Sequence, residues 1–133
     1  MIYKDDKHKA IYEEICGQMR YIDTYHQALA YLISLDNVCR QHIGDIYDVS
    51  TDGIMLDAIH KGWQTSTSAK TTRLAFNLWN GLAADISEDG KMFEEHSGAM
   101  YTVAEIFDSP YSQYYWQAIK LRYQYPEGEK GEM

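Results

Sequence analysis

The sequence has no long apolar run, only two cysteines and two prolines, and few basic residues for a length of 133. Without about 18 consecutive apolar residues, a membrane-spanning helix is excluded. The first ten residues, MIYKDDKHKA, also lack the apolar stretch of a signal peptide. We therefore expect a cytoplasmic protein that does not bind membranes, in which Cys16 and Cys39 are reduced thiols.

Basic residues are outnumbered, twelve Lys and Arg against twenty Asp and Glu, so the formal net charge is −8. Nonspecific nucleic-acid binding needs clustered Lys and Arg for phosphate contacts, and is not expected here. The imbalance reverses between Ala58 and Ala84, where no Asp or Glu occurs while Lys61, Lys70 and Arg73 contribute +3. The rest of the chain therefore carries −11.

Most of the chain follows the 3.6-residue periodicity of amphipathic helices. We expect a mainly α fold: a compact single-domain bundle of about five or six helices over residues 1–125, with one small β-hairpin or ribbon, and a flexible C-terminal tail over 126–133. The turn at 51–53, between short apolar runs, fits either a small hairpin or an ordered loop, and residues 82–101 are expected as a loop or ribbon. The last helix, apolar over most of its circumference, is expected in the middle of the fold. The expected helices cover 5–19, 23–35, 36–43, 68–80, 102–107 and 110–123.

One expected helix has an unusual start. In TSTSAKTTRLAFNLWNG, four polar residues spaced 0, +3, +7 and +10 form one strip on an otherwise apolar helix: Lys70, Arg73, Asn77 and Asn80. Cations near a helix N-terminus oppose the helix dipole, at a cost of about 0.3 to 1 kcal/mol each. A bound anion would reverse that cost, because free backbone N–H groups, hydroxyls and two cations would converge on it. The pattern predicts a phosphate or carboxylate site.

The predicted ligand-binding residues gather at this helix start or supply aromatic rings. The Ser and Thr hydroxyls would donate hydrogen bonds, the two cations would supply charge, Asn77 would contact polar edges, and tyrosines would stack on a base. A competing interpretation is structural: the cations pair with carboxylates of a neighbouring helix, and the Ser/Thr run caps the helix. The predicted residues are Trp63, Thr65, Ser66, Thr67, Ser68, Lys70, Thr71, Arg73, Asn77 and Tyr115.

No catalytic residue, metal ligand or cofactor is predicted. The stretch DISEDGKMFEEH matches the first half of an EF-hand loop, but His96 stands where the bidentate Glu should be. His42, Asp45 and Asp48 are spaced three apart, which is more typical of a surface or capping role than of a metal site. No nucleophile motif surrounds either cysteine, and no Gly-x-Ser-x-Gly occurs.

Two segments, GWQTSTSAKTTRLAFNLWNG and EIFDSPYSQYYWQAIKLRY, resemble a family of small uncharacterised proteins from Gram-positive bacteria and their phages and mobile elements. The resemblance covers under a third of the chain and implies a context rather than an activity. Small acidic proteins of such elements are often inhibitors or sequestering proteins that act against host defence.

Three functional hypotheses follow. The first is a non-enzymatic protein that sequesters a phosphorylated small molecule, such as a nucleotide or a nucleotide-derived signal. The second is an acidic protein that covers a basic surface of a bacterial host protein, such as a nucleic-acid-binding or defence protein. The third, a hydrolase with His42, Asp45 or Glu94 as base, has the least support. Homo-oligomers are compatible with each of them.

Overall fold

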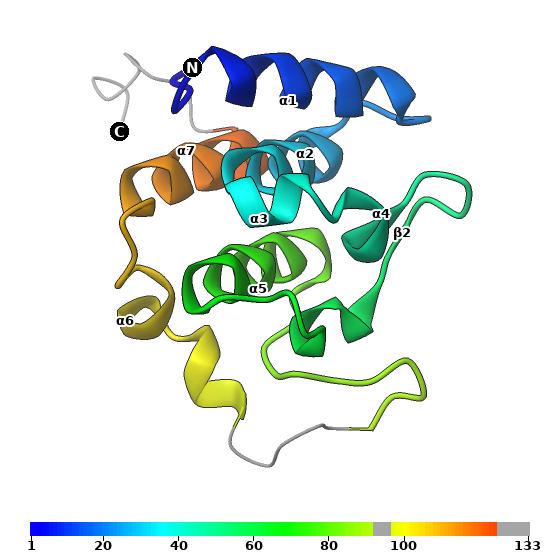
Figure 1. The fold of residues 1–133 in the computed structure, drawn as a ribbon, viewed down its shortest axis with the longest axis vertical. Coiled ribbons are helices and arrows are strands. Elements are labelled where there is room, and N and C mark those ends of the chain that lie inside the picture. Colours follow the sequence, from blue (N-terminus) through cyan, green and yellow to red (C-terminus); the bar gives the residue numbers. More distant parts are fainter. Residues whose placement is uncertain (92–96, 125–133) are drawn as a thin grey trace.

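The computed structural model describes residues 1–91 and 97–124, and these form a mainly helical fold with one small hairpin, as the sequence predicts (Figure 1). The predicted tail at 126–133, together with Glu94 and His96, lies outside the described residues. No helix in the described ranges is long and apolar enough to cross a membrane. In chain order the elements are α1 Asp6–Gln18, α2 Thr24–Leu35, α3 Asn37–Arg40, α4 Ile43–Ile46, β1 Tyr47–Asp48, β2 Gly53–Ile54, the 3-10 helix η1 Leu56–His60, α5 Ser66–Asn80, the 3-10 helix η2 Ser97–Tyr101, α6 Val103–Ile106 and α7 Ser112–Tyr123.

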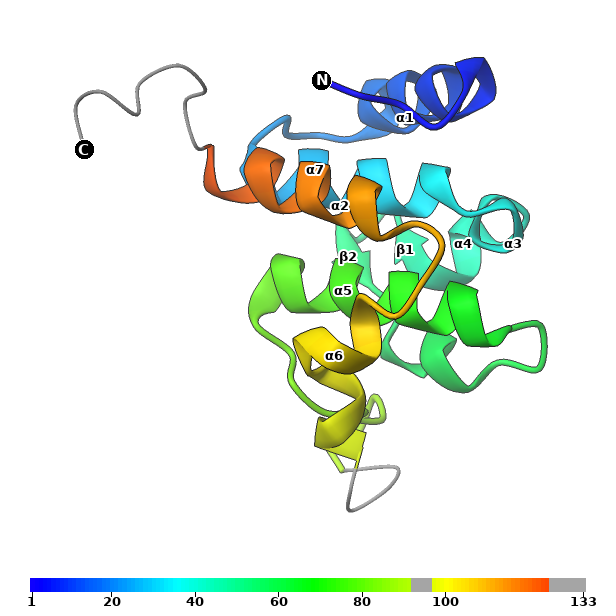
Figure 2. The same ribbon diagram turned by 90° about the vertical axis from the view of Figure 1, so that its left-hand side faces the viewer.

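Helix α2 occupies the centre of the fold and contacts α1, α5 and α7. In Figure 2, α1 lies above a layer formed by α2 and α7, and α5 lies below that layer. The expectation that the last helix is central is therefore wrong. Helix α7 buries only Tyr115 and Ala118, while Trp116 and Tyr123 are 57% and 55% exposed. The physical reason is that α2 is buried on every side from Ala28 to Leu35, whereas on α7 the large rings of Trp116 and Tyr123 carry polar groups that stay at the surface.

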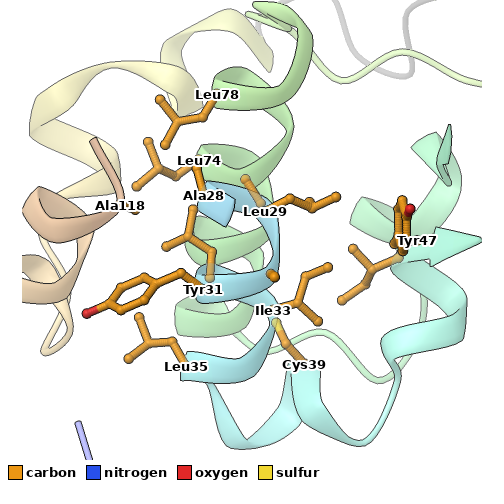
Figure 3. Close-up of a cluster of buried hydrophobic side chains, with 14 of the residues drawn as sticks. Ala28, Leu29, Tyr31, Ile33, Leu35, Cys39, Tyr47, Leu74, Leu78 and Ala118 are labelled. Atoms are coloured by element: carbon orange, nitrogen blue, oxygen red, sulfur yellow. The ribbon is translucent and has the colours of Figure 1, made fainter. Parts of the chain in front are cut away.

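One continuous core joins the long helices to the hairpin. Figure 3 shows Leu74 and Leu78 of α5 close to the α2 side chains, with Ala118 of α7 on one side and Tyr47 of the hairpin on the other. Leu29 of α2 is completely buried. Burying a leucine of this kind stabilises the fold by roughly 1.5 to 3 kcal/mol, so this core fixes the position of α5 against α2.

Helix ends follow the capping residues of the sequence. The side chains of Asp5, Asp23, Asp36 and Thr102 accept backbone N–H groups at the starts of α1, α2, α3 and α6. These bonds satisfy donors that a helix start would otherwise leave without partners. Gly81 ends α5 in the left-handed conformation, with φ 80°.

Three boundaries differ from the sequence-based expectation. Helix α5 begins at Ser66 rather than Ser68, because Thr65 caps it. Arg73 therefore lies in the middle of the helix and not near its first turn.

The helix expected over 36–43 is two separate turns, and Gly44, the expected stop, lies inside the second of them. The break between the turns lets Cys39 and Ile46 both reach the core. Helix α7 begins two residues later than expected, because the Ser109 hydroxyl accepts the N–H of Tyr111 and holds a turn ahead of the helix.

The expected hairpin is present, with Tyr47 paired to Ile54 and Asp48 to Gly53 in an antiparallel register. Asp52 in its turn has a positive φ of 56°, a conformation that Asp adopts more readily than most residues. The turn carries the Asp52 carboxylate back towards the first turn of α2, where it contacts His26.

Candidate functional site

The start of α5 is capped by its own side chains. Thr65 Oγ1 accepts the N–H of Ser68 at 3.0 Å, and Ser68 Oγ accepts the N–H of Thr65 at 2.7 Å, which completes a capping box. Ser68 Oγ also donates to Gln64 Oε1 at 2.6 Å. Of the other two predicted hydroxyls in this turn, Ser66 is exposed and Thr67 is half-buried. Two of the four hydroxyls predicted to bind a ligand therefore bind the helix itself.

Thr71 and Tyr115, two further predicted ligand residues, contact each other inside the protein. Their hydroxyl oxygens lie 2.7 Å apart, both residues are buried, and Ser109 Oγ lies 3.1 Å from the Tyr115 hydroxyl. Trp63 is engaged elsewhere: its indole N–H donates to Asp45 Oδ2 at 2.9 Å. The structure therefore does not gather these rings around the start of α5.

Arg73 forms a buried, two-point ion pair with Asp85. Its Nε and Nη2 donate to Asp85 Oδ1 and Oδ2 at 3.2 and 2.9 Å, and the two residues are 8% and 1% exposed. Tyr101 donates its hydroxyl to Asp85 Oδ1 at 2.8 Å, and Ser97 Oγ accepts the Asp85 N–H. Burial lowers the pKa of Arg73, but the hydrogen bonds and charge of Asp85 raise it by more, so the guanidinium stays charged.

Lys70 donates to the backbone carbonyl of Asp108, in the segment between α6 and α7. Lys70 and Arg73, in the second and third turns of α5, thus hold the loops that flank η2, α6 and α7. These contacts agree in kind with the structural interpretation, although Arg73 pairs with a loop carboxylate and Lys70 with a carbonyl, rather than with carboxylates of a neighbouring helix. Anion binding at this end of α5 stays a prediction.

The opposite end of α5 borders an open polar pocket of about 440 Å³. Two members of the predicted polar strip, Asn77 and Asn80, line it together with residues of α2 and α7. Asn77 Nδ2 donates to the carbonyl of Leu82 at 2.9 Å, which fixes its amide at the pocket wall. The side chains that line this pocket are those of Tyr25, Asn77, Trp79, Asn80, Arg122 and Tyr123.

Arg122 is held rigidly at this pocket. Its guanidinium carbon lies 3.7 Å from the ring centre of Tyr25 and 4.8 Å from that of Tyr123. Its Nε donates to the carbonyl of Leu78 in the last turn of α5 at 2.8 Å. Neither Nη group has a hydrogen-bond acceptor within residues 1–91 and 97–124. A fixed guanidinium with two unused donor groups is suited to a carboxylate or phosphate.

An apolar pocket of about 180 Å³ lies beside the polar one, and the two share Asn77 and Tyr123. Its apolar lining comes from α5, from α6 with the residue after it, and from α7: Leu74, Leu78, Val103, Ile106, Phe107 and Ile119. The two pockets are adjacent, one polar and one apolar, and we call them together the α5 groove. Concave sites of this mixed character are typical of small-molecule binding.

Sequence reasoning included Asn77 in the site but missed Tyr25, Arg122 and Tyr123. One signal was present: no Asp or Glu occurs between Tyr111 and Gln124, so a cation there has no carboxylate on its own helix. That α2 and α7 meet at the end of α5 is a tertiary contact, which no local pattern in the sequence reveals.

The residues proposed for metal binding or hydrolysis do not form a site in the described parts of the chain. No group of three or more His, Cys, Asp or Glu residues in those parts could hold a metal ion. Asp85, the first position of the EF-hand-like stretch, is bound to Arg73. His42 Nδ1 lies 3.5 Å from Asp45 Oδ2, and its ring stacks on Trp63 at 4.3 Å. Glu94 lies outside the described residues.

A buried histidine supports the aromatic wall of the polar pocket. His26 Nδ1 lies 2.6 Å from Asp23 Oδ1, its Nε2 lies 2.8 Å from Asp52 Oδ1, and its ring centre is 4.8 Å from that of Trp79. Tyr47 also donates its hydroxyl to Asp52. Burial lowers the pKa of His26, but the two carboxylates together raise it above its ordinary value. The same contacts lower the pKa of Asp23 and of Asp52, against the effect of burial.

The chain belongs to DUF6075, a family of unknown function, whose model matches residues 1–132. Membership of an uncharacterised family, which the resemblance of the two segments implies, is confirmed. No curated protein and no solved structure matches the chain.

Proposed function

We propose that this chain is a non-enzymatic binding protein that sequesters a phosphorylated small molecule of the nucleotide class. We place the ligand at the C-terminal end of α5, rather than at the start of the helix. The observation that supports this placement is Arg122, whose guanidinium is fixed between Tyr25 and Tyr123 with both Nη groups unused by the described residues.

The chemistry of the groove suits such a ligand. The planar guanidinium offers parallel N–H donors that match two phosphate oxygens. The amides of Asn77 and Asn80 can hydrogen-bond to a sugar or to the edge of a base, and apolar side chains lie beside them in the adjacent pocket. The polar pocket, at about 440 Å³, lies within the range of small-molecule sites, roughly 300 to 1,000 Å³.

Sequestration in the cytoplasm, directed against a host defence signal, is the role that we propose for this binding. It rests on the resemblance to proteins of phages and mobile elements. Sequestration predicts that the protein binds one equivalent of ligand and leaves it chemically unchanged. The test is to incubate the two together, denature the protein by heat and analyse the released ligand by chromatography.

Thermal unfolding tests the binding proposal. The unfolding midpoint of the parent protein is measured alone and with phosphate, mononucleotides, cyclic nucleotides and ADP-ribose. The same series is measured with the Arg122→Gln variant. A ligand at about 100 times its Kd adds roughly 2.7 kcal/mol, which raises the midpoint by several degrees in a domain of this size. We expect a shift that Arg122→Gln removes. The matched control is Arg20→Gln, the same change at an exposed arginine that lines neither pocket.

Lys70→Ala separates the two ends of α5. If it removes the shift while Arg122→Gln keeps it, the anion binds at the start of α5, and our placement of the site is wrong. If no compound shifts the midpoint of the parent protein, the small-molecule proposal itself fails.

A second candidate function is the acidic interaction protein. The observation that favours it is a pocket of about 140 Å³ lined by Asp45, Asp57 and Glu88, in which Lys61 is the only cation among the described residues. Such a hollow would accept a Lys or Arg side chain of a basic host protein. This candidate predicts that Asp45→Asn with Glu88→Gln slows association with a Lys- and Arg-rich peptide probe at low salt, and that Arg122→Gln does not.

A further inference from the structure

We infer that the ligand of the α5 groove carries a single negative charge and an aromatic ring, with the charged group on Arg122 and the ring in the adjoining apolar pocket. Within the nucleotide class, this describes a phosphodiester such as a cyclic mononucleotide, rather than a nucleoside polyphosphate. The inference rests on the proposed function and narrows its ligand.

The apolar pocket is the first part of the argument. It has an aliphatic and aromatic lining, and it shares Asn77 and Tyr123 with the polar pocket, so one molecule can occupy both. Val103 lines it and is 69% exposed. A phosphate alone would leave this apolar surface in water, whereas a ring seated there would remove it from water.

The charge count is the second part. Arg122 is the only charged side chain that lines either pocket in the described parts of the chain. Helices α5 and α7 both end beside it, at Asn80 and Tyr123, and a helix C-terminus carries about half a negative charge. One negative charge therefore meets one cation, while a second would have no partner and would face two helix C-termini in a protein of net charge −8.

The number of charges is tested by calorimetric titration at pH 8 with 3′,5′-cyclic AMP, 5′-AMP, ATP, adenosine and ribose 5-phosphate. At that pH the phosphate of 5′-AMP carries close to two charges, because its second pKa is near 6. We expect 3′,5′-cyclic AMP to bind most tightly, 5′-AMP several-fold more weakly and ATP most weakly of the three. Adenosine, which lacks the charge, should bind about tenfold more weakly than the cyclic nucleotide.

Two variants test the two parts of the groove separately. Val103→Gln places a polar group beside the apolar pocket, and its matched control is Ala104→Gln, at an exposed residue of the same helix that lines neither pocket. We expect Val103→Gln to weaken 3′,5′-cyclic AMP several-fold, with ribose 5-phosphate unchanged. Arg122→Gln should weaken both, and Ala104→Gln should weaken neither.

The outcomes separate this inference from the proposed function. If 5′-AMP or ATP binds more tightly than 3′,5′-cyclic AMP, or if Val103→Gln behaves like Ala104→Gln, the inference is wrong while nucleotide binding stands. If none of the five compounds binds the folded parent protein, the proposed function and the inference fail together.

Discussion

The two cations of α5, Lys70 and Arg73, donate to other groups of the protein, whereas Arg122, beside the C-terminal end of α5, keeps two Nη groups without an acceptor in the described residues. The difference follows from burial. Arg73 is 8% exposed, and a buried charge without a partner would cost several kcal/mol. Arg122 is half-buried beside an open pocket, where water can solvate its free donors. The comparison teaches that a cluster of cations in a sequence does not identify a ligand site until their partners are known.

The largest effect is expected from Arg73→Met, which breaks the buried pair in the middle of α5. The substitution removes the two-point pair of the buried Asp85 carboxylate, and His60 Nε2 remains 3.4 Å from Asp85 Oδ2. We expect a loss of about 3 kcal/mol in the free energy of unfolding, at the low end for a broken buried pair, measured with urea. This prediction differs from that of an anion site, in which removing the cation from an empty helix start leaves the unliganded protein as stable or more stable.

Lys70→Met is the matched control, because it removes the other cation of the same helix but leaves no buried charge without its partner. We expect a loss below about 1 kcal/mol. Arg73→Met with Asp85→Leu should recover part of the stability lost in Arg73→Met, since no buried charge then lacks a partner. If Arg73→Met unfolds with the midpoint of the parent protein, the pair is not structural and the contrast between the two ends of α5 disappears.

A smaller effect is expected from Thr71→Val, which tests whether the hydroxyls at the start of α5 are structural. The substitution removes the contact of 2.7 Å to the buried Tyr115 hydroxyl, which still has Ser109 as a partner. We expect a loss of about 1 kcal/mol, at the low end for a broken buried hydrogen bond. Thr67→Val, the same change at a half-buried threonine of this helix, should cost less. Equal losses in the two variants would contradict the assignment.

Local patterns in the sequence predict the helices and their caps, but not which side chains the charged residues of a helix contact. The spacing of Leu74 and Leu78 and the glycine at 81 define α5 within the sequence itself, because an amphipathic face and a C-cap are properties of one segment. Asp85, the partner of Arg73, stands in the polar run just after the helix, which the sequence predicts as a loop or ribbon. A loop pattern does not show which of its carboxylates becomes buried.

The candidate site was predictable only in part. Asn77 was identified from the polar strip of its own helix. Tyr25 and Arg122 meet there because α2 and α7 both pack at the end of α5. That arrangement follows from the central position of α2, which the sequence does not predict. The apolar circumference of α7 pointed to the wrong helix, since aromatic residues with polar groups can line a surface groove as well as fill a core.

The smallest effect concerns pH. In the middle of α5, Arg73 shares Asp85 with His60, whose Nε2 lies 3.4 Å from Asp85 Oδ2. At the C-terminal end of α5, Trp79 packs on His26, whose pKa is raised in the folded state. A raised pKa means that the protonated imidazole stabilises the fold fully below its unfolded value of 6.5, and that this stability is lost as the pH rises through the folded value.

We therefore expect the stability difference between the parent protein and His26→Gln to shrink from pH 6 towards pH 9, as measured by urea unfolding at each pH. Below pH 6 the difference shrinks again once Asp23 and Asp52 are protonated, because their lowered pKa values make their contribution vanish as the pH falls through the folded values. His8, whose pKa burial lowers to about 4, is present in both proteins and cancels. Thr71→Val should show no such pH dependence relative to the parent. A His26→Gln difference that is constant from pH 6 to 9 would mean that His26 has the same pKa in the folded and unfolded protein, and that its carboxylate contacts do not favour the protonated imidazole.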